Sequence, residues 1–273
     1  MKIPIIASLG ASTLVVSAAT YSTTFTPGFT AGNLDGQDNW VAQGQWQADG
    51  SGNVSNTSGA FIRAHNTSVL GSTDIGESME ITATFSLTGF TTPSTDIASF
   101  EEGILQLGMS HQQGVQSFAY GLAAGLFYSP GSGNLVFRGN QGIEGAGTSS
   151  ITVGDASTLG STTWTMQTIF TKTAADTYSV EASLSGSAGT FALNYVANGE
   201  GAVASDLDTD SDGGGILGGM QALPSSAGSG GVATPPFGSV TVSDYSVMVN
   251  PVPEPSSALL LGLGGLLIAR RRR

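Results

Sequence analysis

The 273-residue sequence predicts an all-β protein, an antiparallel β-sandwich, and three observations support this prediction. Apolar and polar residues alternate with a period of two in several segments, which is the pattern of strands with one buried face. Clusters of Gly, Ser, Asn and Asp separate these segments, as turns between short strands require. No long helical period occurs between residues 19 and 250. About a dozen short strands with polar turns are typical of a sandwich or jelly roll.

The predicted strands follow one another along a central domain, residues 20–250. Alternation is clearest in Ser78–Leu87 and in Thr177–Leu184, where every second residue is apolar. Trp164, Met166 and Phe170 share one parity, which places them on the buried face of another strand. Further strands are expected at Ala60–Ala64, Ile104–Ser110, Ser117–Tyr128, Leu135–Arg138 and Thr190–Val196.

The last strand changes parity. Its apolar residues fall on even positions up to Val242 and on odd positions from Tyr245 onward. One extra residue near Ser243-Asp244 would return them to the same face, so the sequence predicts a β-bulge there. The preceding segment, residues 199–236, is poor in apolar residues and rich in Gly, Ser and Asp. We expect it to be a long loop.

The charge of the chain is unevenly distributed. Only Arg63, Arg138 and Lys172 are basic between residues 19 and 250, against nineteen acidic residues, which leaves that span with a net charge of −16. This balance argues against nucleic-acid binding, repels acidic polymers at low salt and favours divalent cations. The absence of Cys excludes disulfide scaffolds and thiolate metal sites.

The first nineteen residues have the features of a secretory signal peptide. Lys2 provides a short basic region, an apolar run continues to Val16, and the small residues Ser17-Ala18-Ala19 follow. We expect signal peptidase to cleave after Ala18 or Ala19. The alternative, a buried first strand, is disfavoured because the run lacks two-residue alternation.

The last residues, 251–273, have the features of a membrane anchor. The apolar run Ala258–Ala269 has twelve residues, and as a helix it would cover about 18 Å, less than the roughly 30 Å of a hydrocarbon core. Arg270, Arg271, Arg272 and Arg273 follow it. By the positive-inside rule these arginines stay cytoplasmic, so the run is expected to act as a stop-transfer transmembrane helix.

This tail resembles the PEP-CTERM sorting signal. The resemblance is carried by Pro253-Glu254-Pro255, the apolar run and the terminal arginines, in that order. It implies recognition by an exosortase in the inner membrane, removal of the tail, and release to the cell surface or outside. It also implies a bacterium with an outer membrane, usually one that makes exopolysaccharide.

The central domain resembles the concanavalin A-like jelly rolls found in exported proteins with this tail. The segment Phe29–Trp40, the strand pattern and a last strand that runs directly into the sorting motif carry this resemblance. Some concanavalin A-like proteins bind or cleave polysaccharides, and exopolysaccharide is therefore a candidate partner.

One acidic stretch is a candidate calcium site. Asp206, Asp208, Asp210 and Asp212 alternate and precede three glycines, and alternate carboxylates suit Ca²⁺. The stretch matches the start of an EF-hand loop, but Gly219 occupies the position where a bidentate Glu is needed. A non-EF calcium loop and a solvated acidic loop both remain open. Ca²⁺ is the one cofactor that the sequence suggests.

Two tryptophans lie near the start of the domain. Trp40, if exposed, would stack on a sugar ring, and the alternative is packing at a strand end. For Trp46 we favour packing, and Trp164 is expected in the core.

The sequence offers little support for catalysis. His65 and His111 lack a Gly-x-Ser-x-Gly elbow and a His-Glu-x-x-His motif. Concanavalin A-like glucanases commonly carry Glu-x-Asp-x-x-Glu, and the closest stretch here begins with Ser72 in place of the first Glu. Asp74 and Glu77 are therefore expected at a turn and at the start of a strand.

Three functions remain. The first is an exported, non-enzymatic cell-surface or matrix protein. The second is a carbohydrate-binding module, with or without Ca²⁺. The third is a polysaccharide hydrolase or lyase, which needs two facing carboxylates that the sequence does not show.

Overall fold

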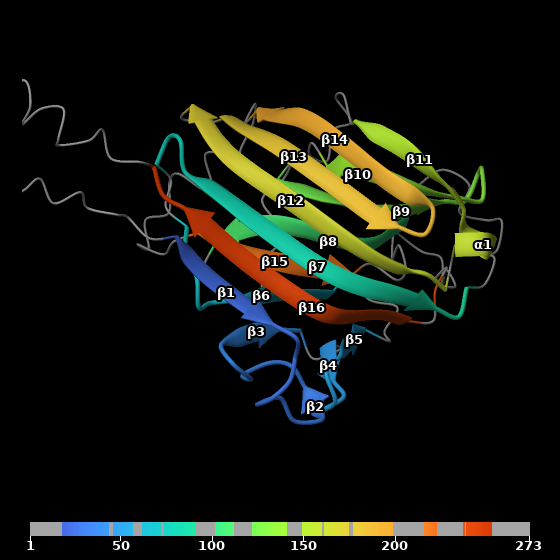
Figure 1. Ribbon diagram of the computed structural model, residues 1–273, viewed down its shortest axis with the longest axis horizontal. Coiled ribbons are helices and arrows are strands. Elements are labelled where there is room, and N and C mark those ends of the chain that lie inside the picture. The colour runs from blue at the N-terminus through green and yellow to red at the C-terminus, as the bar shows by residue number, and fades with distance from the viewer. Residues whose placement is uncertain are drawn as a thin grey trace, which may run out of the picture.

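A computed structural model describes twelve stretches of the chain. These are residues 18–43, 46–56, 62–71, 74–90, 102–111, 122–140, 149–159, 161–174, 177–198, 216–222, 237 and 239–252. Two antiparallel β-sheets lie face to face in it (Figure 1). This confirms the predicted all-β antiparallel sandwich. The expected signal segment, residues 1–19, and the tail, residues 251–273, lie outside the described stretches except for Ala18, Ala19, Pro251 and Val252, and Ala19 is the first residue of β1.

The larger sheet has nine strands. In spatial order they are β14 (Gly189–Asn198), β13 (Thr177–Gly186), β12 (Thr163–Ala174), β7 (Ser78–Thr88), β16 (Ser239–Asn250), β5 (Val54–Asn56), β4 (Trp46–Ala48) and β2 (Gly32–Asn33), with β1 (Ala19–Thr23) also paired to β16.

The smaller sheet has seven strands. Their order is β11 (Ser150–Asp155), β10 (Asn134–Asn140), β9 (Ala123–Ser129), β8 (Glu102–His111), β15 (Ile216–Ala222), β6 (Ile62–Asn66) and β3 (Trp40–Ala42). A short helix, α1 (Ala156–Leu159), follows β11. The chain crosses between the sheets repeatedly: from β2 through β3 to β4, from β5 through β6 to β7, from β7 to β8, from β11 to β12, and from β14 through β15 to β16. This alternation is consistent with a jelly-roll sandwich.

The core lies between the two sheets and follows the predicted alternation. In β7 the residues from Met79 to Leu87 alternate between buried and half-buried along the whole strand. Trp46 and Trp164 are fully buried, which confirms their expected core positions. Burial of this kind of apolar surface contributes roughly 25 cal/mol per Å² and is the main force that holds two sheets together.

The predicted β-bulge is present in β16. Its pairing with β7 shifts register between Val242 and Asp244. Val240 and Val242 are buried before the shift, and Tyr245 is buried after it. The extra residue thus keeps both halves of the strand facing the core, for the reason that the change of parity indicated.

We expected one continuous loop over residues 199–236, and this was wrong for residues 216–222, which form a strand. Strand β15 lies there and pairs with β6 and β8 at the centre of the smaller sheet. All seven of its residues are buried, so no polar face alternates with an apolar one. Two glycines make the strand possible, because a Cβ atom at Gly218 would lie 2.7 Å from Cγ2 of Val247 and one at Gly219 would lie 2.4 Å from Nδ1 of His65.

Deletion of Ser243 tests the bulge. Without this residue, Tyr245 and Val247 would turn to the outer face of the sheet, because side chains alternate along a strand. We expect a loss of at least about 4 kcal/mol in the free energy of unfolding, measured with urea. The control Ser243→Ala keeps the residue count and should cost less than about 1 kcal/mol. Equal stability of the two variants would contradict a structural role of the bulge.

Candidate functional site

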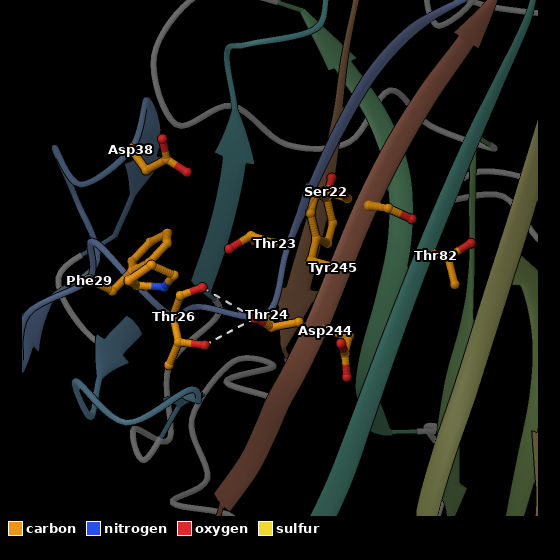
Figure 2. A pocket seen from close by; sticks show the side chains of 11 residues that line it. Ser22, Thr23, Thr24, Thr26, Phe29, Asp38, Thr82, Asp244 and Tyr245 are labelled. Carbon is orange, nitrogen blue, oxygen red and sulfur yellow. Dashed lines mark hydrogen bonds between the residues drawn. The ribbon is translucent and has the colours of Figure 1, made fainter.

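A groove of about 550 Å³ opens on the outer face of the nine-stranded sheet (Figure 2). Figure 2 shows Thr24 and Thr26 between Phe29 and Asp244. The residues that line the groove are Ser22, Thr23, Thr24, Thr26, Pro27, Phe29, Asp38, Thr82, Asp244, Tyr245 and Ser246. Hydroxyls and two carboxylates predominate among them and none is basic, so the lining suits a neutral, hydroxyl-rich ligand better than an anion.

The bulge in β16 lies at the edge of this groove, where Asp244 and Tyr245 contribute to its lining. Before the bulge, Val240–Val242 pair with β5, and after it, residues 245–249 pair with β1. The two partners therefore share one edge of β16 and leave a gap between them. Asp244 lies at this gap, is exposed, and accepts a hydrogen bond from the Ser243 hydroxyl over 3.1 Å.

Packed aromatic rings lie beside the groove. The centroid of the Trp40 ring lies 4.9 Å from that of Tyr245 and 5.8 Å from that of Phe25, and Phe25 lies 5.3 Å from Phe29. Such pairs contribute about 0.5–1.5 kcal/mol each beyond simple burial. Only 1% of the Trp40 surface is exposed. The suggestion that Trp40 stacks on a sugar is therefore corrected: the ring packs in the core and has no face open to a ligand.

A hydrogen-bond chain fixes the Trp40 ring. Its indole N–H donates to the Tyr21 hydroxyl over 3.1 Å, and that hydroxyl donates to Oδ2 of Asp38 over 2.7 Å. Burial, and then the hydrogen bond to Asp38, raise the pKa of the Tyr21 phenol above its usual value. Burial also raises the pKa of Tyr245. Both phenols therefore stay neutral at physiological pH.

Side-chain hydrogen bonds hold the segment Phe29–Trp40 together. The Gln37 amide accepts from the Thr30 N–H over 2.8 Å and donates to the Asn33 carbonyl over 2.6 Å. Asp35 Oδ1 accepts from the Ala42 N–H over 2.9 Å. The segment Phe29–Trp40 is thus a loop held in one conformation by its own side-chain hydrogen bonds. Two of its residues, Phe29 and Asp38, line the groove.

A second feature lies on the face of the seven-stranded sheet that points away from the core, where four polar residues and one glycine form a cross-strand row whose two glutamines are buried. In register, Arg63 pairs with Gln221, Gln221 with Gln106, Gln106 with Gly125, and Gly125 with Arg138. We call these five residues the arginine row. Four spacings of about 4.8 Å separate its two arginines by about 19 Å.

Hydrogen bonds and a ring contact order the arginine row. Arg63 Nε donates to Gln221 Oε1 over 3.0 Å, and Gln221 Nε2 donates to Gln106 Oε1 over 3.4 Å. The Arg138 guanidinium lies 4.3 Å from the centroid of the Phe127 ring. Both arginines are half-buried, and burial lowers the pKa of Arg63 from its usual value. Arginine remains charged in proteins at any physiological pH, so the row carries two fixed positive charges.

Periodicity alone did not reveal the arginine row. Arg63 and Arg138 are two of the three basic residues between residues 19 and 250, and they are 75 positions apart in sequence. The third, Lys172, points into the end of the sandwich, where it is 4% exposed and lies 5.8 Å from the Tyr178 ring centroid. The scarcity of basic residues was the only signal in the sequence that could have drawn attention to the pair.

None of the residues considered for catalysis lines the groove, and His65 lies two residues from Arg63 along β6. His65 is fully buried in β6, and His111 ends β8. Asp74 accepts a backbone hydrogen bond from Glu77 in a turn directly before β7, which confirms the expected turn and strand start. Within the described stretches, no group of three or more His, Asp or Glu residues could hold a metal ion.

The remaining predicted site residues lie outside the described stretches. They are Asp206, Asp208, Asp210 and Asp212, the motif Pro253-Glu254-Pro255, and Arg270, Arg271, Arg272 and Arg273. The calcium site therefore stays a prediction. The described part of the chain contains no helix long and apolar enough to cross a membrane.

Comparison with known proteins identifies the tail. Residues 251–273 match the PEP-CTERM protein-sorting motif. The chain thus combines a β-sandwich with a C-terminal sorting motif that begins directly after β16. Such a motif implies an exported protein whose membrane-anchored precursor is processed by an exosortase.

Solved structures with a similar fold include carbohydrate-active proteins. An endo-1,3-β-glucanase from Streptomyces sioyaensis is 13% identical, with 85% of this chain and 96% of that chain covered and a TM-score of 0.48. A lectin from Bauhinia forficata in complex with GalNAc is 9% identical, with 86% and 100% covered and a TM-score of 0.45. An alginate lyase variant in complex with an alginate tetrasaccharide is 14% identical, with 84% and 96% covered and a TM-score of 0.43. The search of curated proteins returned no match. Similarities this low carry no conclusion about activity.

The hydrogen-bond chain yields a prediction about alkaline stability. Tyr21→Phe leaves the buried Trp40 N–H without its acceptor, so the free energy of unfolding at pH 7 should fall by about 1–2 kcal/mol. In the wild type, a raised phenol pKa means that stability is fully present below about pH 10 and declines above it, because the unfolded chain then loses its proton first.

Urea unfolding between pH 8 and pH 11 measures this effect. The decline in stability above about pH 10 should be shallower in Tyr21→Phe than in the wild type, because one buried phenol has been removed. An unchanged slope would show that Tyr21 does not titrate in the way its burial implies.

Proposed function

We propose that this protein is exported, held briefly at the inner membrane by its tail, and released by an exosortase to the cell surface or extracellular matrix, where its sandwich acts without catalysis. One observation carries the proposal: the matched sorting motif, residues 251–273, starts directly after Asn250, the last residue of β16. Signal peptidase would act at the other end of the same domain, after Ala18 or Ala19.

The physical character of the tail supports a transient anchor. Its twelve-residue apolar run contains three glycines, which are poor helix formers, and is shorter than a typical transmembrane helix. Pro253 and Pro255 favour an extended backbone in front of the run, which suits a cleavage enzyme that needs an accessible strand-like segment. Four terminal arginines hold the far end of the run on the cytoplasmic side.

Substitution of the motif carboxylate tests the sorting proposal. In the native host, Glu254→Ala should leave the tail attached, so the protein accumulates in the inner-membrane fraction at its precursor mass. Glu181→Ala is the matched control, because Glu181 is an exposed carboxylate on β13 far from the tail in sequence. Mass spectrometry and membrane fractionation provide the measurements. Normal release of Glu254→Ala would contradict processing at this motif.

A second function, binding of an acidic polysaccharide, is favoured by the arginine row. Each guanidinium can bind a carboxylate through two parallel hydrogen bonds. The half-buried positions of Arg63 and Arg138 restrict their motion, which reduces the entropy lost on binding. Gln106 and Gln221 between them are each only 4% exposed and are hydrogen-bonded to one another, so they hold the Arg63 guanidinium in place and do not contact the ligand.

The arginine row is positively charged, whereas the domain as a whole is strongly negative. Most of the domain repels acidic polymers, because its net charge is −16 between residues 19 and 250. A polyuronate would bind here by exchanging its carboxylates for contacts that Arg63 and Arg138 already make within the protein, while the rest of the domain repels it. Binding should weaken as salt is added, because the charges of the row are only partly buried.

Polysaccharide binding can be measured with the protein recovered from producing cells. We expect binding to alginate, a polyuronate, and not to neutral dextran. Arg63→Gln and Arg138→Gln should each weaken alginate binding about tenfold, or about 1.4 kcal/mol. Glu181→Gln changes a charge on the opposite sheet and should have little effect. Thermal unfolding confirms that each variant is folded.

Two further arms separate the alternatives. Loss of alginate binding in EDTA would support a calcium site at Asp206, Asp208, Asp210 and Asp212, which we keep as a proposal. Dextran binding that is lost in Asp244→Asn would instead assign carbohydrate recognition to the groove. Equal alginate binding by the wild type and both arginine variants would contradict the role of the arginine row.

A further inference from the structure

The two ends of the domain meet at one end of the sandwich. In the pairing of β1 with β16, Ala19 lies opposite Val249, and in the pairing with β7, Asn250 lies opposite Ser78. Thr177 and Asn198 pair at the same end of the sheet. We call this end, defined by Ala19, Ser78, Asn198 and Asn250, the terminal pole. In Figure 1 it lies on the left, where β1 begins and β16 ends.

Exposed apolar side chains gather at the terminal pole. The described stretches contain three exposed large hydrophobic residues: Leu70 (43%), Ile75 (59%) and Val196 (51%). Ile75 precedes Gly76, where an added Cβ atom would lie 3.5 Å from Cγ2 of Val252, so it lies beside the exit of the tail.

The other two apolar residues lie at the same end. Leu70 precedes Gly71, where a Cβ atom would lie 2.9 Å from the Met79 side chain, next to the start of β7. Val196 pairs with Ser179, two residues from the Thr177–Asn198 pair. Single exposed apolar residues are ordinary on a protein surface, but here all three lie at the end where the tail leaves.

Few residues separate the terminal pole from the two apolar segments of the chain, the predicted signal segment and the run Ala258–Ala269. Only five residues, 253–257, separate Val252 from the apolar run that starts at Ala258, and five extended residues span at most about 18 Å. At the other terminus, the predicted signal segment ends at Ala19, the first residue of β1. Both apolar segments therefore enter the domain at the same pole, and both place their charged ends, Lys2 and the four arginines, on one side of a membrane.

We propose that the terminal pole is the membrane-facing surface of the anchored precursor, with Leu70 and Ile75 in contact with the lipid interface. This inference rests on the anchored precursor of the proposed function. The lipid surface is a neutral one, because the described residues Asp74 and Glu77 near the pole are acidic and would oppose anionic headgroups.

This orientation leaves the rest of the domain accessible. Asp244 lies six residues before Asn250 along β16, so this end of the groove is about 20 Å from the pole, while Ser22, three residues from Ala19, lies about 10 Å from it. The β13–β14 turn, which contains Ser187, lies at the opposite end, because Gly186 and Gly189 pair there. The groove can therefore meet a soluble ligand while the precursor is still anchored.

Site-specific fluorescence tests the orientation. The chain has no cysteine, so single substitutions can be labelled without a background. The full chain with Ile75→Cys, Leu70→Cys or Ser187→Cys is labelled with nitrobenzoxadiazole and reconstituted into phosphatidylcholine vesicles that contain nitroxide-headgroup lipids. All three positions are exposed, so folding should be unaffected. We expect at least threefold stronger quenching at positions 75 and 70 than at position 187.

Flotation separates the two proposals. If the labelled proteins float with the vesicles but positions 75 and 187 are quenched equally, or 187 more strongly, the orientation is overturned and the anchor stands. If none of the proteins floats with the vesicles, the anchored precursor fails, and the orientation that depends on it fails too.

Discussion

The structure depends on one strand, β16, and on the way in which two other strands, β5 and β1, pair with different parts of the same edge of it. One side of this strand pairs with β7 along its full length, and the other side is shared between β5 and β1. The bulge at Ser243-Asp244 marks the boundary between the two partners. It keeps the buried face continuous, and Asp244 beside it lines the groove. The sorting motif then begins where the strand ends.

The same strand links the fold to the proposed biology. Because β1 runs antiparallel to the end of β16, the signal segment and the tail leave from neighbouring positions at the terminal pole. A domain with this arrangement can be tethered at both ends without distortion of its sheets. The groove lies farther along β16, and the arginine row lies on the other sheet, so neither depends on the tail for its geometry. The proposed sorting and the proposed ligand binding are therefore separable by experiment.

Whether a strand could be predicted from the sequence depended on whether one or both of its faces are buried. Strands β7, β13 and β16 have one buried face, so their alternation, and even the bulge, could be predicted from the position of apolar residues. Strand β15 is buried on both faces and contains Gly218 and Gly219, so it lacked this signal. Trp40 was ambiguous because nothing in the sequence decides which face a strand-end tryptophan takes. The arginine row depends on register between distant strands, which periodicity does not encode.

The central claim is the register of β1 on β16, and a disulfide test examines it directly. In this register Thr20 lies opposite Met248, within the roughly 4.4–6.8 Å between Cα atoms that a disulfide needs. Thr20→Cys/Met248→Cys in the cysteine-free exported chain should form an intramolecular disulfide in an oxidising compartment, while Thr20→Cys/Ser246→Cys, two residues out of register, should remain reduced. A disulfide of equal yield in both variants, or in the second alone, would contradict the account.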